Sequence, residues 1–306
     1  MAHDQLFKEF LHEFLRDFLK LFYPEVEARL DFGTLRFLDT ESFTSFPEGS
    51  SREADIVAEL HTREGTPELL LVHIEVQARR QRDFAKRMFQ YYAPLWAKYE
   101  IPIFPLAVYV RRGRSALSEE EYSVDLFGRE QLRFRYAAVA LACFEGWEYV
   151  EKGSPVAAAL AALMNRRGAR EPLKLRLLMM ERVALSGLDD ARKFLLLNLI
   201  ETYFKLAGDE RQKFERLLSR ERYREVKKMQ LTWAEKIEEK GRKEGKKEGL
   251  LEGKRDALLQ LLTSKFGPLP EETIARVRAV QSLRELDRYL DRVLVASSLA
   301  DMGVGN

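Results

Sequence analysis

The sequence is poor in cysteine and histidine, which excludes intramolecular disulfides and argues against a zinc site. Its 306 residues contain one cysteine, Cys143, and four histidines. A single cysteine cannot form an intramolecular disulfide, and its apolar neighbours in "AVALACFEGW" predict that it is buried. His3, His12 and His61 form no cluster with ligand spacing, so the sequence does not indicate a zinc site. His73 is expected to be packed or to form a neutral hydrogen bond.

Long apolar runs and a strong net charge are also missing. The longest apolar runs, such as "VAAALAALM", are far shorter than the roughly 20 residues of a membrane helix. Residues 1 to 22 carry acidic and basic side chains throughout, unlike a secretory signal. We therefore expect a soluble, cytoplasmic protein with no membrane partner. Lys and Arg (51) nearly balance Asp and Glu (49), so any surface that binds nucleic acid has to be local.

The chain is long enough for more than one domain, and its character changes along its length. Strand and helix patterns alternate in the first half, whereas only helical patterns follow residue 153. We predict an α/β core over residues 1–150, a helical region over 151–234, a charged helix or linker over 235–256 and a small helical domain over 257–306.

Apolar periodicity predicts the elements of the first half. "HDQLFKEFLHEFLRDFLKLF" has its aromatic and leucine residues at helical spacing. "FGTLRFLD", "READIVAELHT" and "LLLVHIEVQ" are typical of strands, and the last two predict a hairpin. A helix follows over 82–100, where Pro94 is expected to kink or shorten it. "PIFPLAVYVRRG" and "LRFRYAAVALACF" predict two further strands.

The second half predicts helices over 155–166, 171–186, 189–206 and 209–240, and three short helices at the end of the chain. Between them, glycine recurs at positions 241, 245, 249 and 253 among Lys and Glu. Each glycine costs a helix about 1 kcal/mol relative to alanine, so the segment is predicted to be a marginal, solvated helix or a linker. The alternative is a close helix-to-helix contact through these small residues, which would make a homo-oligomer.

The predicted hairpin carries the residues with chemical potential. Asp55 belongs to its first strand, and Glu75 and Gln77 share one face of its second strand because side chains alternate. Two carboxylates on neighbouring strands can hold a divalent cation such as Mg²⁺, which polarises a phosphate and activates water. Gln77 could orient that water through its carbonyl oxygen. The alternative is structural: Asp55 or Glu75 pairs with an arginine, such as Arg79 or Arg87.

Basic residues surround this hairpin and predict a phosphate-binding surface. They are Arg79, Arg80, Arg82, Lys86 and Arg87 around the start of the second helix, and Arg111, Arg112 and Arg114 after the next strand. Cations are disfavoured at a helix start unless an anion also lies there, and a DNA backbone would supply that anion. The alternative is intramolecular pairing with glutamates, which contributes little at a surface.

Four short motifs carry a resemblance to a known family. "HDQLFK", "READIV", "HIEVQ" and "RMFQYY", in this order, resemble the Rpn family of recombination-promoting nucleases and putative transposases, within the PD-(D/E)XK nuclease superfamily. The resemblance spans roughly residues 3 to 145. The glycine-punctuated run and the final segment also resemble what often follows this core, including a small C-terminal helical domain of unknown function.

This resemblance implies an α/β fold: a restriction-endonuclease-like core with an α-β-β-β-α-β mixed sheet, followed by an all-α C-terminal region. It implies that Asp55 and Glu75 bind Mg²⁺, with Mn²⁺ as an alternative. Asp4 resembles the acidic position that opens the family's first helix. Gln77 occupies the place of the superfamily's lysine.

If a positive charge is still required at the site, Lys8 or Arg87 would supply it.

The implied function is a metal-dependent endonuclease that hydrolyses DNA, linked to recombination, mobile elements or phage defence. The alternative is an inactive nuclease fold that binds DNA or protein, and the missing lysine is the argument for it. A glycoside hydrolase using Asp55 and Glu75 is disfavoured by the many arginines and by the lack of aromatic sugar platforms nearby.

Overall fold

The computed structural model describes residues 3–38, 56–65, 67–75, 84–110, 115–166, 171–206 and 208–303. The chain divides into two compact units, Met1–Leu231 and Thr232–Asn306. No helix within the described part combines the length and the apolar character that a membrane span requires. The finer division expected from the sequence, into segments 1–150, 151–234, 235–256 and 257–306, remains a prediction.

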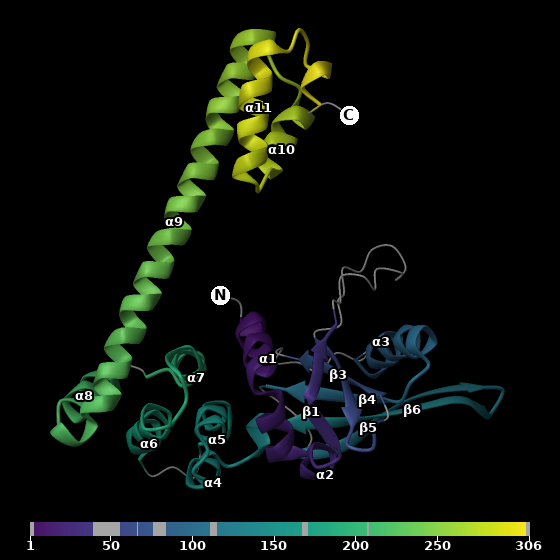
Figure 1. The fold of residues 1–306 in the computed structure, drawn as a ribbon, viewed down its shortest axis with the longest axis vertical. Coiled ribbons are helices and arrows are strands. Elements are labelled where there is room, and N and C mark those ends of the chain that lie inside the picture. The colour runs from purple at the N-terminus through teal and green to yellow at the C-terminus, as the bar shows by residue number, and fades with distance from the viewer. Residues whose placement is uncertain are drawn as a thin grey trace. The chain divides into compact units, whose positions relative to one another are not determined.

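The first unit is built on a six-stranded mixed sheet with the order β1-β2-β3-β4-β6-β5 (Figure 1). Its strands are β1 (Leu30–Phe37), β2 (Ile56–Thr62), β3 (Pro67–Glu75), β4 (Ile103–Tyr109), β5 (Leu117–Leu126) and β6 (Arg129–Ala140). β3 and β6 each pair with β4 in parallel, and the other pairs are antiparallel. This arrangement confirms the predicted mixed α/β core with a helical C-terminal region.

Helices pack on this sheet through the apolar stripes visible in the sequence. α1 (His3–Phe22) is followed by the short α2 (Pro24–Glu27), and α3 (Phe84–Tyr99) connects β3 to β4. The stripe of α1 is buried; it comprises Leu6, Phe7, Phe10, Leu11, Phe14, Leu15, Phe18, Leu19 and Phe22. α3 continues through Pro94 to its end at Tyr99 instead of stopping there.

The face of the sheet under α3 has a largely aromatic core. Phe84 and Met88 of α3 pack with Tyr109 of β4 and with Phe134 and Tyr136 of β6. Leu106 and Val108 are also fully buried; because strand side chains alternate, they face the opposite side of the sheet. Both faces of β4 are therefore covered, as expected for a strand with parallel neighbours.

Short helices complete the first unit. They are α4 (Gly146–Glu151), α5 (Pro155–Leu160), α6 (Pro172–Ala184), α7 (Asp190–Tyr203) and α8 (Asp209–Leu218). Every residue from Val156 to Met164 is at most 7% exposed, so α5 and the turn after it lie inside this helical region. Gly146 allows α4 to lie close to the turn after α5, because a Cβ at this position would be only 3.1 Å from the carbonyl oxygen of Ala161.

The predicted helix over 209–240 and the predicted burial of Cys143 are wrong, whereas the glycine run is a helix, one of the two states predicted for it. The predicted helix over 209–240 is interrupted after Leu218, where the Ser219 hydroxyl donates to the Arg216 carbonyl oxygen at 2.7 Å. A new helix, α9 (Arg224–Phe266), then continues through all four glycine positions. Cys143 is exposed rather than buried, because it lies in a 3-10 turn after β6, beyond the alternation of that strand.

The second unit has its own hydrophobic core. The end of α9 packs with α10 (Glu271–Ala279) and α11 (Leu283–Val295) around a set of buried aliphatic residues. These are Leu251, Leu258, Leu262, Val277, Leu286 and Val293. Lys265 of α9 satisfies the end of α11, because its Nζ donates to the carbonyl oxygens of Val293 at 2.7 Å and Leu294 at 3.0 Å.

Candidate functional site

Glu75, one of the predicted carboxylates, ends a strand at the centre of the sheet. β2 begins at Ile56, the residue after Asp55, and Ile56 pairs with Val72 of β3. β3 ends at Glu75, which pairs in parallel with Tyr109 of β4. β3 lies between β2 and β4, so Glu75 occupies a central strand end rather than an edge of the sheet.

Most of the predicted site residues lie outside the described residues. This holds for Asp55, Gln77, Arg79, Arg80, Arg82, Arg111, Arg112 and Arg114. Glu75 and Asp4 are placed only by their backbones, in β3 and α1. Their role in binding a metal stays a prediction. No group of three or more His, Cys, Asp or Glu side chains forms a rival metal site within the described ranges.

A carboxylate that the sequence analysis missed lies close to the end of β4. Glu120 of β5 accepts hydrogen bonds on Oε2 from the hydroxyls of Tyr109, at 2.9 Å, and Tyr136, at 2.8 Å. Burial, and then the neighbouring Tyr136 and Glu120, raise the pKa of Tyr109, so its hydroxyl stays a donor. Since Tyr109 is the partner of Glu75 in the sheet, this hydrogen-bonded cluster is next to the predicted site.

The two candidate cations for the site are described, and they lie on different helices. Lys8 is half-buried on α1. Burial, and secondarily the charge of Lys8, lower the pKa of His12 one turn further on. Arg87 lies on α3, with its guanidinium 5.4 Å from the centre of the Phe84 ring, and that ring lies 5.3 Å from the ring of Tyr109. Arg87 is therefore close to the end of β4.

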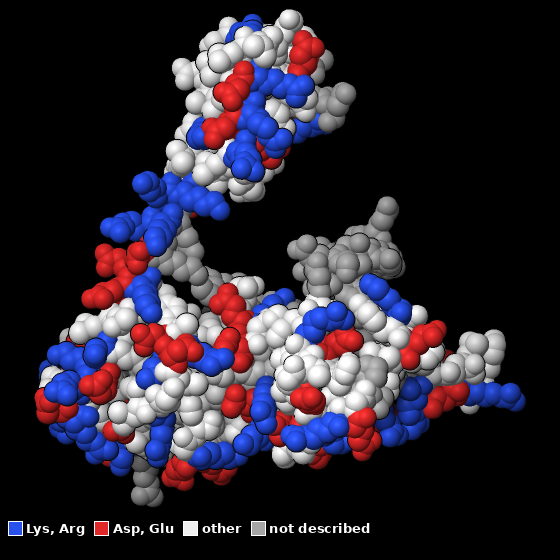
Figure 2. Space-filling view, viewed as in Figure 1, with Lys and Arg blue, Asp and Glu red and all other residues white. Residues whose placement is uncertain are grey.

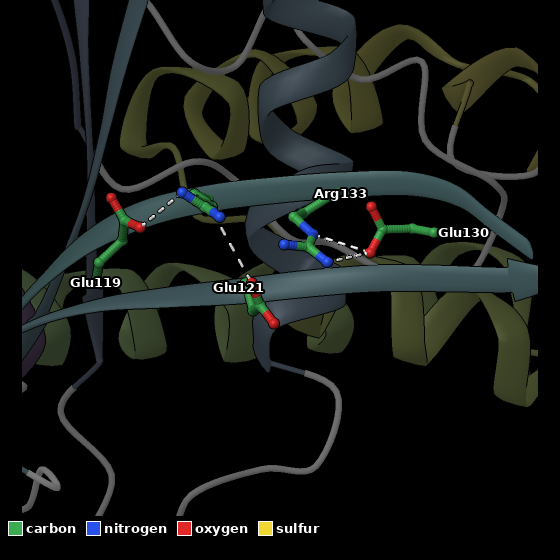
Figure 3. Close-up of polar contacts among 5 residues, drawn as sticks. Glu119, Glu121, Glu130 and Arg133 are labelled. Atoms are coloured by element: carbon green, nitrogen blue, oxygen red, sulfur yellow. Dashed lines mark hydrogen bonds and ion pairs between the residues drawn. The ribbon is translucent and has the colours of Figure 1, made fainter.

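The basic surface expected around the site is only partly described. Lys86 is exposed on α3. Two arginines of the β5–β6 hairpin are engaged with carboxylates (Figure 3): Arg133 with Glu130 at 2.5 Å, and Arg135 with Glu119 at 3.4 Å. Such exposed pairs contribute at most about 1 kcal/mol each. Figure 2 accordingly shows basic and acidic side chains interspersed over the first unit, so the hairpin adds no basic patch.

A surface hollow elsewhere in the first unit contains none of the predicted residues. Its volume is about 760 Å³, and it is lined mainly by α6 and the loop that follows, with Leu178, Leu185 and Arg182 among its residues. Arg222 at its rim pairs with Glu181 at 3.7 Å. Its position gives no support to the predicted hairpin chemistry.

Comparison with known proteins gives a match for the region that contains the predicted site residues. Residues 1–135 match the family model described as putative transposase, YhgA-like. The match extends from α1 into β6 and includes all the residues predicted for the site. It confirms the resemblance to the putative transposases of the Rpn family and points to a function related to mobile elements. Neither the curated proteins nor the solved structures gave a match.

Proposed function

We propose that this chain, through the region that matches the YhgA-like putative transposases, is a metal-dependent endonuclease that hydrolyses DNA phosphodiester bonds. The observation that supports this most directly is the sheet register. Glu75 ends a central strand, and the antiparallel neighbour β2 starts one residue after Asp55. Recombination, mobile-element transfer and phage defence are the processes in which such an activity would act.

The donor chemistry of these residues fits a hard divalent cation. Asp55, Glu75 and Asp4 offer carboxylate oxygens, and Gln77 offers an amide oxygen. An oxygen-only set is typical of Mg²⁺ or Mn²⁺ sites and unlike the nitrogen and sulfur ligands of zinc. When bound, such a cation would polarise the scissile phosphate and lower the pKa of a bound water.

The remaining residues would position the substrate and balance its charge. Gln77 would accept a hydrogen bond from the attacking water. Arg87 or Lys8 would supply the positive charge that the superfamily's lysine gives elsewhere, and a guanidinium can bind a phosphate through two hydrogen bonds. The arginines after β3 and after β4 would hold the flanking phosphates.

An inactive nuclease fold that binds DNA or protein is the second candidate. The observation that favours it is Gln77, because an amide cannot carry the charge of a lysine. The two candidates differ in what metal and carboxylates do. A binding module should hold DNA in EDTA and without Asp55 or Glu75, and it should cleave nothing.

Cleavage of supercoiled plasmid by the full chain tests the proposal. Wild type is compared with Asp55→Asn and Glu75→Gln in Mg²⁺, Mn²⁺ or EDTA, and Glu64→Gln, an exposed turn residue of the same hairpin, is the matched control. We expect nicking that needs the metal, persists in the control and falls about 100-fold or more in each site variant. Metal-independent nicking, or equal cleavage by all variants, would refute the nuclease assignment, and an inert wild type would support the binding module.

A further inference from the structure

Three arginines form a ridge along α11 in the second unit. Arg284, Arg288 and Arg292 recur every fourth residue, and all three side chains are exposed. At a rise of about 1.5 Å per residue, they span about 12 Å along one side of the helix. Figure 2 shows Lys and Arg side chains over α10 and α11, with Asp and Glu side chains beside them.

α11 also carries three carboxylates, Glu285, Asp287 and Asp291, and two of them are engaged by other groups. Asp287 forms an ion pair with Lys254, and Glu285 accepts a hydrogen bond from the Tyr289 hydroxyl at 3.3 Å. None of the three arginines takes part in an ion pair with any residue that the structure describes. The charge of Arg292 contributes, after hydrogen bonds from Ser298 and Ser297, to a lowered pKa of Asp301.

The ridge has a rigid support. On the opposite side of α11, Leu286 and Val293 are buried in the core of the unit. Ser282 caps the start of the helix by accepting a hydrogen bond from the Glu285 amide at 3.4 Å, and Lys265 satisfies its end. Little side-chain ordering beyond the arginines themselves would therefore accompany binding.

We infer that α11 is a phosphate-binding surface of the second unit and that its ligand is the backbone of duplex DNA. Regularly spaced guanidiniums match a ligand whose charges also repeat regularly. The choice of DNA rests on the function proposed for the first unit. A membrane surface fits less well, because an interfacial helix needs a free apolar face, whereas the apolar face of α11 is buried.

Anisotropy of a short labelled duplex tests this inference with the full chain in EDTA. The ridge variant is Arg284→Gln/Arg288→Gln/Arg292→Gln. The control is Arg211→Gln/Arg216→Gln/Arg220→Gln, which removes the same charge from exposed positions of the first unit. A second variant, Arg284→Gln/Arg288→Gln, avoids the neighbourhood of Asp301. Far-UV circular dichroism checks that each variant is folded.

We expect the ridge variant to bind the duplex about tenfold more weakly than wild type. The slope of log K against log salt should also be shallower by about 2 to 3, as expected for the loss of three phosphate contacts. For the double variant this slope should be shallower by about 2. The control should keep an affinity and a slope close to those of wild type. Equal slopes in ridge and control variants would overturn the inference, as would an inert wild type or binding only to anionic vesicles. The binding assay contains no divalent metal, so its result is independent of the plasmid cleavage assay. If the wild type binds DNA through α11 but cleaves no plasmid, only the nuclease proposal is rejected. If it cleaves plasmid but the salt slope of the ridge variant is unchanged, only the α11 surface is rejected.

Discussion

Arg176 of α6 and Glu201 of α7 form a buried ion pair, and removing one partner should destabilise the first unit strongly. Arg176 Nη2 lies 2.5 Å from Glu201 Oε2, and the two side chains are 4% and 16% exposed. Arg176 also donates to the carbonyl oxygen of Phe204, and its guanidinium lies 5.0 Å from the centre of the Phe214 ring. The charge is thus held by a carboxylate, a carbonyl and an aromatic ring.

The expected size of the effect follows from what each change leaves behind. Arg176→Met leaves the Glu201 carboxylate without its cation, and Glu201→Leu leaves the guanidinium without its anion. Breaking a buried pair in this way costs about 3 to 5 kcal/mol. The double variant leaves neither charge, so its free energy of unfolding should lie within about 2 kcal/mol of wild type. The two substitutions should therefore be strongly non-additive.

Urea unfolding of the full chain measures these differences. Tryptophan fluorescence and circular dichroism both report on the two units, because Trp96 and Trp147 belong to the first unit and Trp233 to the second. The transitions of the two units need not coincide. The exposed pair Arg133 and Glu130 is the matched control, and Arg133→Met and Glu130→Leu should each change stability by less than about 1 kcal/mol. If the buried pair showed a coupling as small as this control, the reasoning about desolvated charge would be wrong.

Two further predictions concern positions where the local sequence opposes the structure. Replacing the α9 glycines at positions 241, 245, 249 and 253 with alanine should stabilise this helix by about 1 kcal/mol per site, because an added Cβ meets nothing within 4 Å. Slower amide hydrogen exchange in α9 would confirm this prediction, and unchanged exchange would contradict it. Phe127 and Gly128 form the two-residue turn of the β5–β6 hairpin with φ of 53° and 73°, so Phe127→Asn should raise the free energy of unfolding by about 1 kcal/mol. Phe127 is 95% exposed, and a loss of stability in Phe127→Asn would mean that its ring makes a stabilising contact.

The elements that sequence patterns predicted are those with a clear apolar periodicity. α1 buries the same aromatic stripe that the spacing indicates, and β2 and β3 form the expected hairpin. β5 was missed because "LSEEEYSVDL" belongs to an edge strand that is mostly exposed. Its half-buried face carries Ser118, Glu120 and Tyr122, so burial alternates without an apolar alternation in the sequence. Its three consecutive glutamates are charges of the kind that protect a sheet edge from pairing with another chain.

The error in the helical half has a different origin. The predicted helix over 209–240 had the right composition at both ends, but its interruption depends on a local hydrogen bond of Ser219 and on the burial of Phe214 and Leu218. The glycine run is not an error of this kind, because it was expected to be a marginal, solvated helix or a linker on the balance of glycine propensity and Glu/Lys pairs. In α9 it is helical, with support from pairs such as Glu239 and Lys243 at 2.6 Å.

The candidate site shows the same division between local pattern and tertiary contact. Glu75 could be singled out because it ends an apolar strand with a polar face. Glu120 could not, because its two tyrosine partners come from strands that are neighbours only in the folded sheet. The distinction bears on function, since a carboxylate oxygen that already accepts two hydroxyl hydrogen bonds is poorly available as a metal ligand. Glu120 is therefore better suited to fixing the end of β4 beside Glu75 than to replacing Asp55 or Glu75 at the metal.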